Sequence, residues 1–333
     1  MRRALLAAAA TAFATGATAA EPPAYVAPDV PAGGGPFKAV MRVEPGLPTH
    51  TVYRPADLAA LGARRLPVLA WGNGACVALG NRFRPFLTEI ASHGFVAIAV
   101  GPIGEKAVEQ AVSGPATRGV PAPGSPADFL LKAGLIDLER LAPGVLPAPF
   151  STSAMLTQAI DWAAAENRRA ASPLFGRLDL ERVAVMGQSC GGIQAIAAAL
   201  DPRVKTLGVW NSGLFDHPTR AFEIAAAPVD KASLKLIKVP AIYISGDDSD
   251  QAKKNADDDV DRLDQAPVFR AWREATGHGG TYREPGGGAF GSVAVDWLRW
   301  QLQGDADAAK TFAGAACRLC TDPAWHVRRK KID

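Results

Sequence analysis

The sequence predicts an α/β protein in which a mainly parallel central sheet is covered by helices on both faces. Short apolar runs alternate with segments of helical spacing along most of the 333 residues, which is typical of a parallel sheet. Hydrophobic residues make up 48% of the chain and charged residues 21%, as in ordinary globular proteins. No internal repeat or linker interrupts the alternation, so we expect a single domain from residue 20 to residue 333.

The charge balance excludes one broad class of function. The chain has 36 lysines and arginines against 33 aspartates and glutamates, a formal net charge of +3. A dedicated nucleic-acid-binding domain would be clearly basic along one face, so no nucleic-acid partner is expected. The four cysteines are also too few for a small disulfide-rich scaffold.

The N-terminus has the pattern of a secretory signal peptide. Arg2 and Arg3 form a short basic start, an alanine-rich apolar run follows, and Ala17-Thr18-Ala19 matches the A-x-A cleavage pattern. We therefore expect residues 1–19 to be removed and the mature protein to be secreted or periplasmic. No other segment approaches the length of a membrane span, so none is expected.

The predicted elements follow one another in a regular order. Two short strands open the domain, and we expect them to join one edge of the sheet. Apolar runs and helical spacings then alternate. Strands are predicted at residues 38–43, 49–54, 66–71, 95–100, 182–186, 204–210, 241–245 and 267–272. Helices are predicted at residues 82–93, 151–169, after residue 189 up to 200, 255–263, 292–303 and about 306–313.

Two segments depart from this alternation. Residues 103–150 are rich in proline and glycine and are too long for a routine connection between a strand and a helix. A solvated loop and a lid or cap over a pocket are both consistent with that composition. Residues 316–333 are expected to form a C-terminal tail, in which the basic run Arg328–Lys331 and His326 are solvated.

The clearest chemical motif is Gly187-Gln188-Ser189-Cys190-Gly191, which fits G-x-S-x-G between a strand and a small-residue helix. At such a sharp turn the serine backbone is strained and its neighbours must be very small. The turn holds the hydroxyl above the helix N-terminus, whose dipole favours a developing anion. The motif therefore predicts that Ser189 is a nucleophile.

A serine nucleophile needs a base and an acid. His278, between glycines after the last predicted strand, is the preferred base, and His217 is the rival. Asp250, in the loop after the strand at residues 241–245, is the preferred acid, and Asp248 is the reserve. The nearby run Asp257-Asp258-Asp259 lacks the glycine of a calcium-binding loop, and we expect it to be a solvated acidic face.

An oxyanion hole needs two backbone N–H groups aimed at one point. The residue after the nucleophile, Cys190, is expected to supply one of them. The loop after the strand at residues 66–71 is expected to supply the other, from Asn73. The glycines on either side of Asn73 are equally consistent with a plain tight turn.

These motifs carry a family resemblance. At Trp71–Cys76, Gly187–Gly192, Gly246–Asp250 and Gly277–Tyr282 the chain resembles secreted serine esterases of the α/β-hydrolase superfamily, such as dienelactone hydrolases, cutinases and polyester hydrolases. The resemblance implies an α/β-hydrolase fold, acylation of Ser189, proton transfer by His278 and orientation of His278 by an aspartate.

The chain departs from the family pattern at two positions. Trp71 stands where many lipases have histidine, and Cys190 is an unusual neighbour of the nucleophile. A Cys76–Cys190 disulfide would connect the two halves of the oxyanion hole, whereas two small buried thiols are the alternative. For Cys317 and Cys320 we expect a local disulfide or cross-pairing with the other two cysteines rather than a zinc site.

The sequence thus predicts a secreted serine hydrolase that cleaves carboxylic esters. No metal or other cofactor is expected, and the expected partner is a small-molecule or polymeric ester. Trp71, Trp210 and Phe215 are candidates for an apolar substrate pocket, although tryptophans at strand ends are equally often core residues. A serine peptidase or amidase with the same residues, or a non-catalytic binding protein with a hydrolase fold, are the alternatives.

Overall fold

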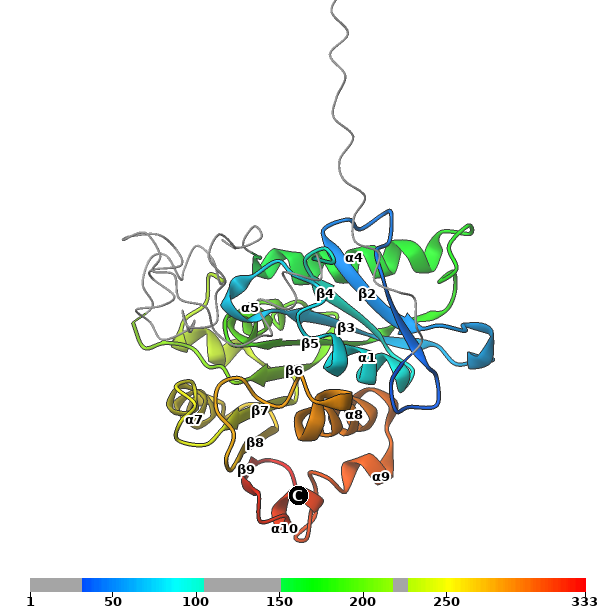
Figure 1. The fold of residues 1–333 in the computed structure, drawn as a ribbon. Coiled ribbons are helices and arrows are strands. Elements are labelled where there is room, and N and C mark those ends of the chain that lie inside the picture. Colours follow the sequence, from blue (N-terminus) through cyan, green and yellow to red (C-terminus); the bar gives the residue numbers. More distant parts are fainter. Residues whose placement is uncertain (1–31, 105–150, 218–226) are drawn as a thin grey trace, which may run out of the picture.

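The computed structural model describes residues 32–104, 151–217 and 227–333, which are organised around one nine-stranded sheet (Figure 1). The predicted signal peptide (residues 1–19) and almost all of the 103–150 segment lie outside the described residues, so both stay predictions. No helix in the described part of the chain is long and apolar enough to cross a membrane.

The sheet is mixed and largely parallel. Its order is β1-β2-β4-β3-β5-β6-β7-β8-β9. The six strands from β4 to β8 in this order run parallel, whereas β1, β2 and β9 pair antiparallel at the two edges. The strands are β1 (Ala39–Arg42), β2 (His50–Pro55), β3 (Leu66–Gly72), β4 (Val96–Val100), β5 (Leu178–Gln188), β6 (Val204–Trp210), β7 (Ala241–Gly246), β8 (Val268–Arg273) and β9 (Trp325–Lys330).

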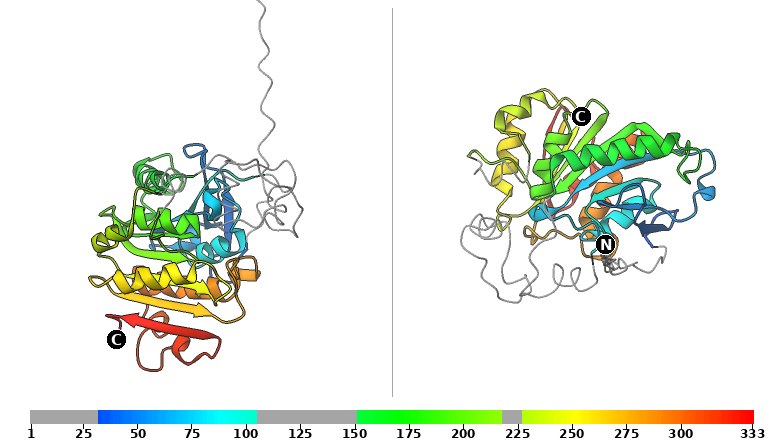
Figure 2. Two further views of the ribbon diagram at one scale, coloured as in Figure 1. Left: turned by 90° about the vertical axis from the view of Figure 1, so that its left-hand side faces the viewer. Right: turned by 90° about the horizontal axis from the view of Figure 1, so that it is seen from above.

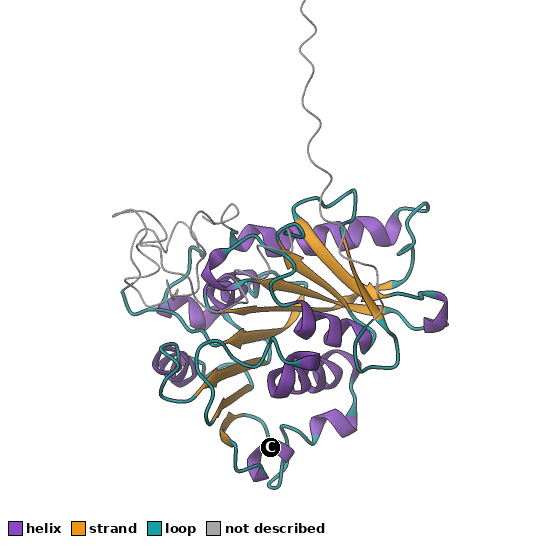
Figure 3. Cartoon of the chain, viewed as in Figure 1, coloured by secondary structure: helices purple, strands orange, loops and turns teal. Residues whose placement is uncertain are grey.

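Helices cover both faces of the sheet, as predicted (Figures 2 and 3). Alternate residues of a strand point to opposite faces, and in the central strands both sets are apolar, which creates two cores. One core lies under α4 (Ser153–Arg168), α5 (Cys190–Ala198) and α7 (Lys253–Arg262). The other lies under α1 (Arg84–Ser92) and α8 (Gly288–Gln303) and is rich in aromatic rings. The predicted fold class is therefore confirmed.

Helical spacing of the apolar residues accounts for the long helices. In α8 the buried residues Phe290, Val293, Ala294, Trp297 and Leu298 recur every three or four positions and form one stripe against the sheet. This helix begins four residues before the predicted start, because Gly287 and the preceding glycine-rich turn lead directly into it.

Several short helical segments complete the described chain. Residues 306–313 form only a four-residue helix, so that prediction was too long. The short segments are η1 (Ala59–Leu61), η2 (Gly74–Cys76), η4 (Lys231–Leu236), η5 (Pro285–Gly287), α9 (Ala306–Ala309) and α10 (Arg318–Thr321).

The C-terminal residues do not form the predicted tail, although His326, Arg328 and Lys331 are exposed, as expected. Residues 325–330 form β9, which pairs antiparallel with β8 along its whole length and closes the sheet edge farthest from β1 (Figure 1). Arg328 pairs with Asp261 and Lys330 with Asp264, so acidic residues at and just after the end of α7 balance part of the basic run. Sequence patterns missed this strand because its charged residues find their partners more than 60 residues away.

Substitution of Phe86 tests how much the aromatic core contributes to stability. Its ring is fully buried and contacts Trp71, Trp210 and Tyr282. Phe86→Ala is expected to lower the free energy of unfolding by about 3–5 kcal/mol in urea titrations, because it leaves a cavity that its neighbours cannot fill. The control Phe175→Ala removes a ring that is 52% exposed and is expected to change stability by less than about 1 kcal/mol. Equal losses in the two variants would contradict this account of the core.

Candidate active site

Ser189 lies at a sharp turn between β5 and α5. Its φ of 54° and ψ of −121° place a non-glycine residue in a strained region of backbone space. A Cβ atom on Gly187 would lie 2.1 Å from the carbonyl oxygen of Gly191, and a Cβ atom on Gly191 would lie 2.1 Å from that of Gly72. The turn therefore requires glycine on both sides of the serine, which confirms the predicted strand–turn–helix geometry.

His278 and Asp250 complete a continuous hydrogen-bonded chain with Ser189. The Nε2 atom of His278 lies 3.0 Å from the Ser189 hydroxyl oxygen, and its Nδ1 atom lies 2.7 Å from Oδ1 of Asp250. The serine follows β5, the aspartate follows β7 and the histidine follows β8. Because these strands are parallel, their carboxyl ends share one edge of the sheet, and the structure brings the three preferred residues together there.

The two alternative residues lie elsewhere. Asp248 is 97% exposed and pairs with Lys253, so the geometry favours Asp250 as the acid. His217 is exposed, whereas His278 is half-buried beside the serine. The remaining three histidines have other contacts: His50 with Thr49 and the Met155 carbonyl, His93 with Glu89, and His326, which is stacked on Trp272, with Glu274.

Four donors surround the buried carboxylate of Asp250. Oδ1 faces His278 and accepts from the Ala252 N–H at 3.0 Å, while Oδ2 accepts from the Gly246 N–H at 3.0 Å and from Asn211 Nδ2 at 2.8 Å. Burial by itself would raise the pKa of Asp250, but these hydrogen bonds and the interaction with His278 outweigh it and hold the pKa below its usual value. The group therefore remains a carboxylate at neutral pH and can orient the imidazole.

Asn211 and Tyr282 are site residues that the sequence analysis missed. Asn211 is fully buried and donates to Asp250, and the Tyr282 hydroxyl in turn donates to Oδ1 of Asn211. Asn211 has a positive φ of 42°, a conformation that asparagine tolerates better than most residues. Its position directly after β6, between the serine and aspartate strands, was the signal available in the sequence.

Gln188, the residue before Ser189, connects two loops of the candidate site. Its Nε2 donates to the carbonyl oxygen of His278 at 3.1 Å. Its Oε1 packs so closely against Gly74 that a Cβ atom there would lie 2.0 Å away. The side chain therefore sets the histidine loop relative to the turn after β3.

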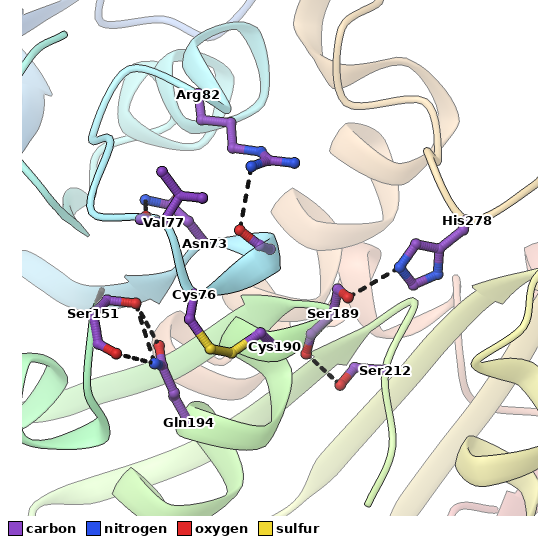
Figure 4. The surroundings of a disulfide bond; sticks show 11 residues. Asn73, Cys76, Val77, Arg82, Ser151, Ser189, Cys190, Gln194, Ser212 and His278 are labelled. Atoms are coloured by element: carbon purple, nitrogen blue, oxygen red, sulfur yellow. Dashed lines mark hydrogen bonds between the residues drawn. A yellow bond between two sulfur atoms is a disulfide. The ribbon is translucent and has the colours of Figure 1, made fainter. Parts of the chain in front are cut away.

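The two predicted oxyanion-hole residues are brought together beside Ser189. Cys190 is the first residue of α5, so its N–H has no intrahelical acceptor. The Asn73 backbone nitrogen is so close to α5 that a Cβ atom on Gly191 would lie 2.7 Å from it. The Asn73 side chain is buried and donates to the carbonyls of Val77, Leu79 and Val100, which holds the turn in place. Figure 4 shows this turn on one side of Ser189 and His278 on the other.

Two disulfides connect the four cysteines. Cys76 is bonded to Cys190, and Cys317 to Cys320. Of the arrangements left open by the sequence, the structure therefore contains the bridge beside Ser189 together with the local C-terminal one.

The expectation of a pocket wall was wrong for Trp71 and Trp210. Both indoles are fully buried and pack against Phe86 in the aromatic core beneath the sheet. They lie there because strand residues alternate in direction, and these two point to the α1/α8 face. Phe215 is partly buried at the end of a described segment and packs on the other core.

No protein-family model matches the chain, and no curated protein matches it significantly in sequence. The mixed, mostly parallel nine-stranded sheet with helices on both faces is an α/β architecture consistent with an α/β-hydrolase-like fold.

A second buried carboxylate supports the loop that carries Asn211. Asp259 of α7 was expected in a solvated acidic face, but its side chain is fully buried. It accepts from the Leu214 N–H at 2.8 Å and pairs with Lys231 at 2.7 Å. Burial raises the pKa of Asp259 to about 7 although Lys231 opposes the shift.

The raised pKa predicts a pH dependence of stability. Between about pH 4 and pH 7 the folded state holds a proton that the unfolded state, with an aspartate pKa of about 3.9, has lost. This group therefore favours folding at about pH 4 and loses that contribution as the pH rises through about 7, at no more than about 1.4 kcal/mol per pH unit.

Urea titrations from pH 4 to pH 7.5 test the effect. Asp259→Asn cannot ionise, so its stability relative to the wild type is expected to rise with pH. The control Asp248→Asn changes an exposed aspartate and is expected to run parallel to the wild type. Parallel curves for Asp259→Asn and the wild type would refute the raised pKa.

Proposed function

We propose that this protein is a serine hydrolase that cleaves carboxylic esters through an acyl-enzyme on Ser189. The observation that carries the proposal is the continuous chain of hydrogen bonds from Ser189 through His278 to the buried carboxylate of Asp250. In the neutral imidazole, an Nδ1–H donated to Asp250 leaves Nε2 free to accept the serine proton. This tautomer is the one that a general base needs.

The first half of the proposed reaction forms the acyl-enzyme. The Ser189 oxygen attacks the ester carbonyl carbon while its proton moves to Nε2 of His278. The carbonyl oxygen becomes an oxyanion, which the backbone N–H groups of Asn73 and Cys190 would bind beside the N-terminus of α5. The imidazolium then donates its proton to the alcohol oxygen, and the alcohol leaves.

The second half of the proposed reaction releases the acid. Water attacks the acyl carbon, and His278 takes its proton and returns it to the Ser189 oxygen. Asp250 retains its charge throughout and stabilises the imidazolium in both halves. Its four donors hold the carboxylate in one orientation, which supports this role.

The disulfides support a place of action outside the cytoplasm. Disulfides form and persist in oxidising compartments such as the periplasm or the extracellular space. We propose that the protein is secreted or periplasmic, which agrees with the signal-peptide pattern at residues 1–19.

A panel of p-nitrophenyl esters of increasing acyl length tests the proposed activity. Ser189→Ala is expected to lower kcat by about 10⁶-fold because no nucleophile remains. Asp250→Asn is expected to lower kcat by about 10⁴-fold because the histidine loses its orientation and its counter-charge.

Two matched substitutions serve as controls. Asp248→Asn and Ser292→Ala change exposed residues of the same types and are expected to keep the wild-type rate. A wild type no faster than Ser189→Ala would reject an esterase and favour a binding protein. Faster cleavage of peptide anilides than of esters would favour the amidase alternative.

A further inference from the structure

The Cys76–Cys190 disulfide joins the two parts of the chain on which the proposed oxyanion hole depends. Cys190 directly follows Ser189 and begins α5, while Cys76 lies three residues after Asn73 and ends η2. The two cysteines are 114 residues apart in sequence, and both side chains are buried.

Both ends of this bridge lie in strained backbone. Ala75 and Cys76 have φ values of 56° and 51°, and Ser189, next to the other cysteine, has 54°. Non-glycine residues remain in this region only where the surrounding structure holds them. The bridge connects the two strained turns directly, and so opposes relaxation of either one away from the other.

Hydrogen bonds hold the backbone carbonyl groups of the turn that contains Cys76 (Figure 4). The Ser151 N–H donates to the carbonyl oxygen of Cys76 at 2.7 Å, and Gln194 of α5 donates to the Ser151 carbonyl at 2.8 Å. Arg82 donates to the carbonyl of Gly74 at 3.2 Å. These contacts fix the carbonyls of the turn, whereas the disulfide joins the turn to the residue whose N–H would bind the oxyanion.

We propose that the Cys76–Cys190 disulfide is a positioning device for the oxyanion hole, so that the site is fully competent only while this bond is oxidised. The inference rests on the proposed esterase function. Hydrogen-bond donors to a developing oxyanion act only when they are held within about 0.5 Å of the productive geometry. Loss of the bridge allows Asn73 and Cys190 to move apart, which weakens binding of the transition state more than binding of the substrate.

The redox step is a simple thiol–disulfide exchange. A dithiol reductant supplies two electrons and two protons, the Cys76–Cys190 bond becomes two thiols, and the reductant becomes a cyclic disulfide. Because the proposed hole uses backbone N–H groups, neither cysteine side chain takes part in the chemistry. Substitution of both cysteines therefore removes the tether and leaves the donors themselves in place.

The second disulfide provides a matched control. Cys317–Cys320 joins two residues of the same turn at the start of α10, in the part of the chain that leads to β9. Cys76→Ala/Cys190→Ala is compared with Cys317→Ala/Cys320→Ala, and Cys76→Ser/Cys190→Ser is a second variant in case the alanine pair does not fold. Wild type treated with dithiothreitol, with each thiol counted by mass spectrometry after alkylation, tests the same bond without mutation.

The readouts separate positioning from general stability. For a p-nitrophenyl ester, loss of the Cys76–Cys190 bridge is expected to lower kcat by about 10- to 1,000-fold and to change KM by less than about threefold. The inhibition constant of an alkyl boronic acid, which mimics the tetrahedral intermediate, is expected to rise in parallel with the loss of kcat. The Cys317–Cys320 variant is expected to keep both constants within about twofold of the wild type.

The possible outcomes distinguish a positioning role of the Cys76–Cys190 disulfide from general destabilisation and from failure of the proposed function. An unchanged kcat and boronate affinity in a variant without the Cys76–Cys190 bridge, or in wild type whose Cys76 and Cys190 are alkylated, would overturn the positioning role and leave the proposed esterase intact. An equal loss in the Cys317–Cys320 variant would assign the effect to general destabilisation. Oxidised wild type with no more activity than Ser189→Ala would overturn both the proposed function and this inference.

Discussion

The geometry of the whole site depends on a contact between three glycine backbones. Gly72 at the end of β3, Gly187 at the end of β5 and Gly191 in the first turn of α5 approach so closely that a single Cβ atom on any of them would overlap a neighbouring backbone. Protein interiors are packed too tightly to absorb such an overlap without a backbone shift. This close approach places the start of α5 against the turn of Asn73, and therefore sets where the Ser189 hydroxyl lies relative to both.

The parallel sheet is the second feature that sets the geometry of the site. Parallel strands end at one edge, so residues far apart in sequence, such as Ser189, Asp250 and His278, become neighbours. The site is then held by buried polar contacts: each carboxylate oxygen of Asp250 accepts two hydrogen bonds, and Asn211 and Tyr282 extend the network into the core. A fully satisfied buried network of this kind is rigid, because each member that moved would leave a polar group unpaired.

Much of the fold and the three central residues could be predicted from the sequence, because the signals are local. G-x-S-x-G needs only a strand before it and a helix after it, and His278 and Asp250 each follow an apolar strand. The roles of Asn211, Tyr282 and Gln188 are harder to predict, since they depend on contacts between loops that follow different strands. For Asn211 the only signal is its position directly after a predicted strand. The directions of Trp71 and Trp210 were missed for a related reason: a shift of one residue in a strand moves a side chain from one face of the sheet to the other.

The C-terminal strand β9 has a consequence for how this protein behaves at high concentration. Without β9, strand β8 would be an edge strand whose unpaired backbone N–H and C=O groups could pair with another extended chain. β9 is the edge strand instead, and it carries three charged side chains, Arg328, Arg329 and Lys330. Charged side chains on an edge strand disfavour pairing with a second chain, even where acidic partners such as Asp261 and Asp264 are present. We therefore expect β9 to limit edge-to-edge association, and we expect a fusion tag or truncation that displaced it to lower solubility while the Ser189–His278–Asp250 arrangement stays in place.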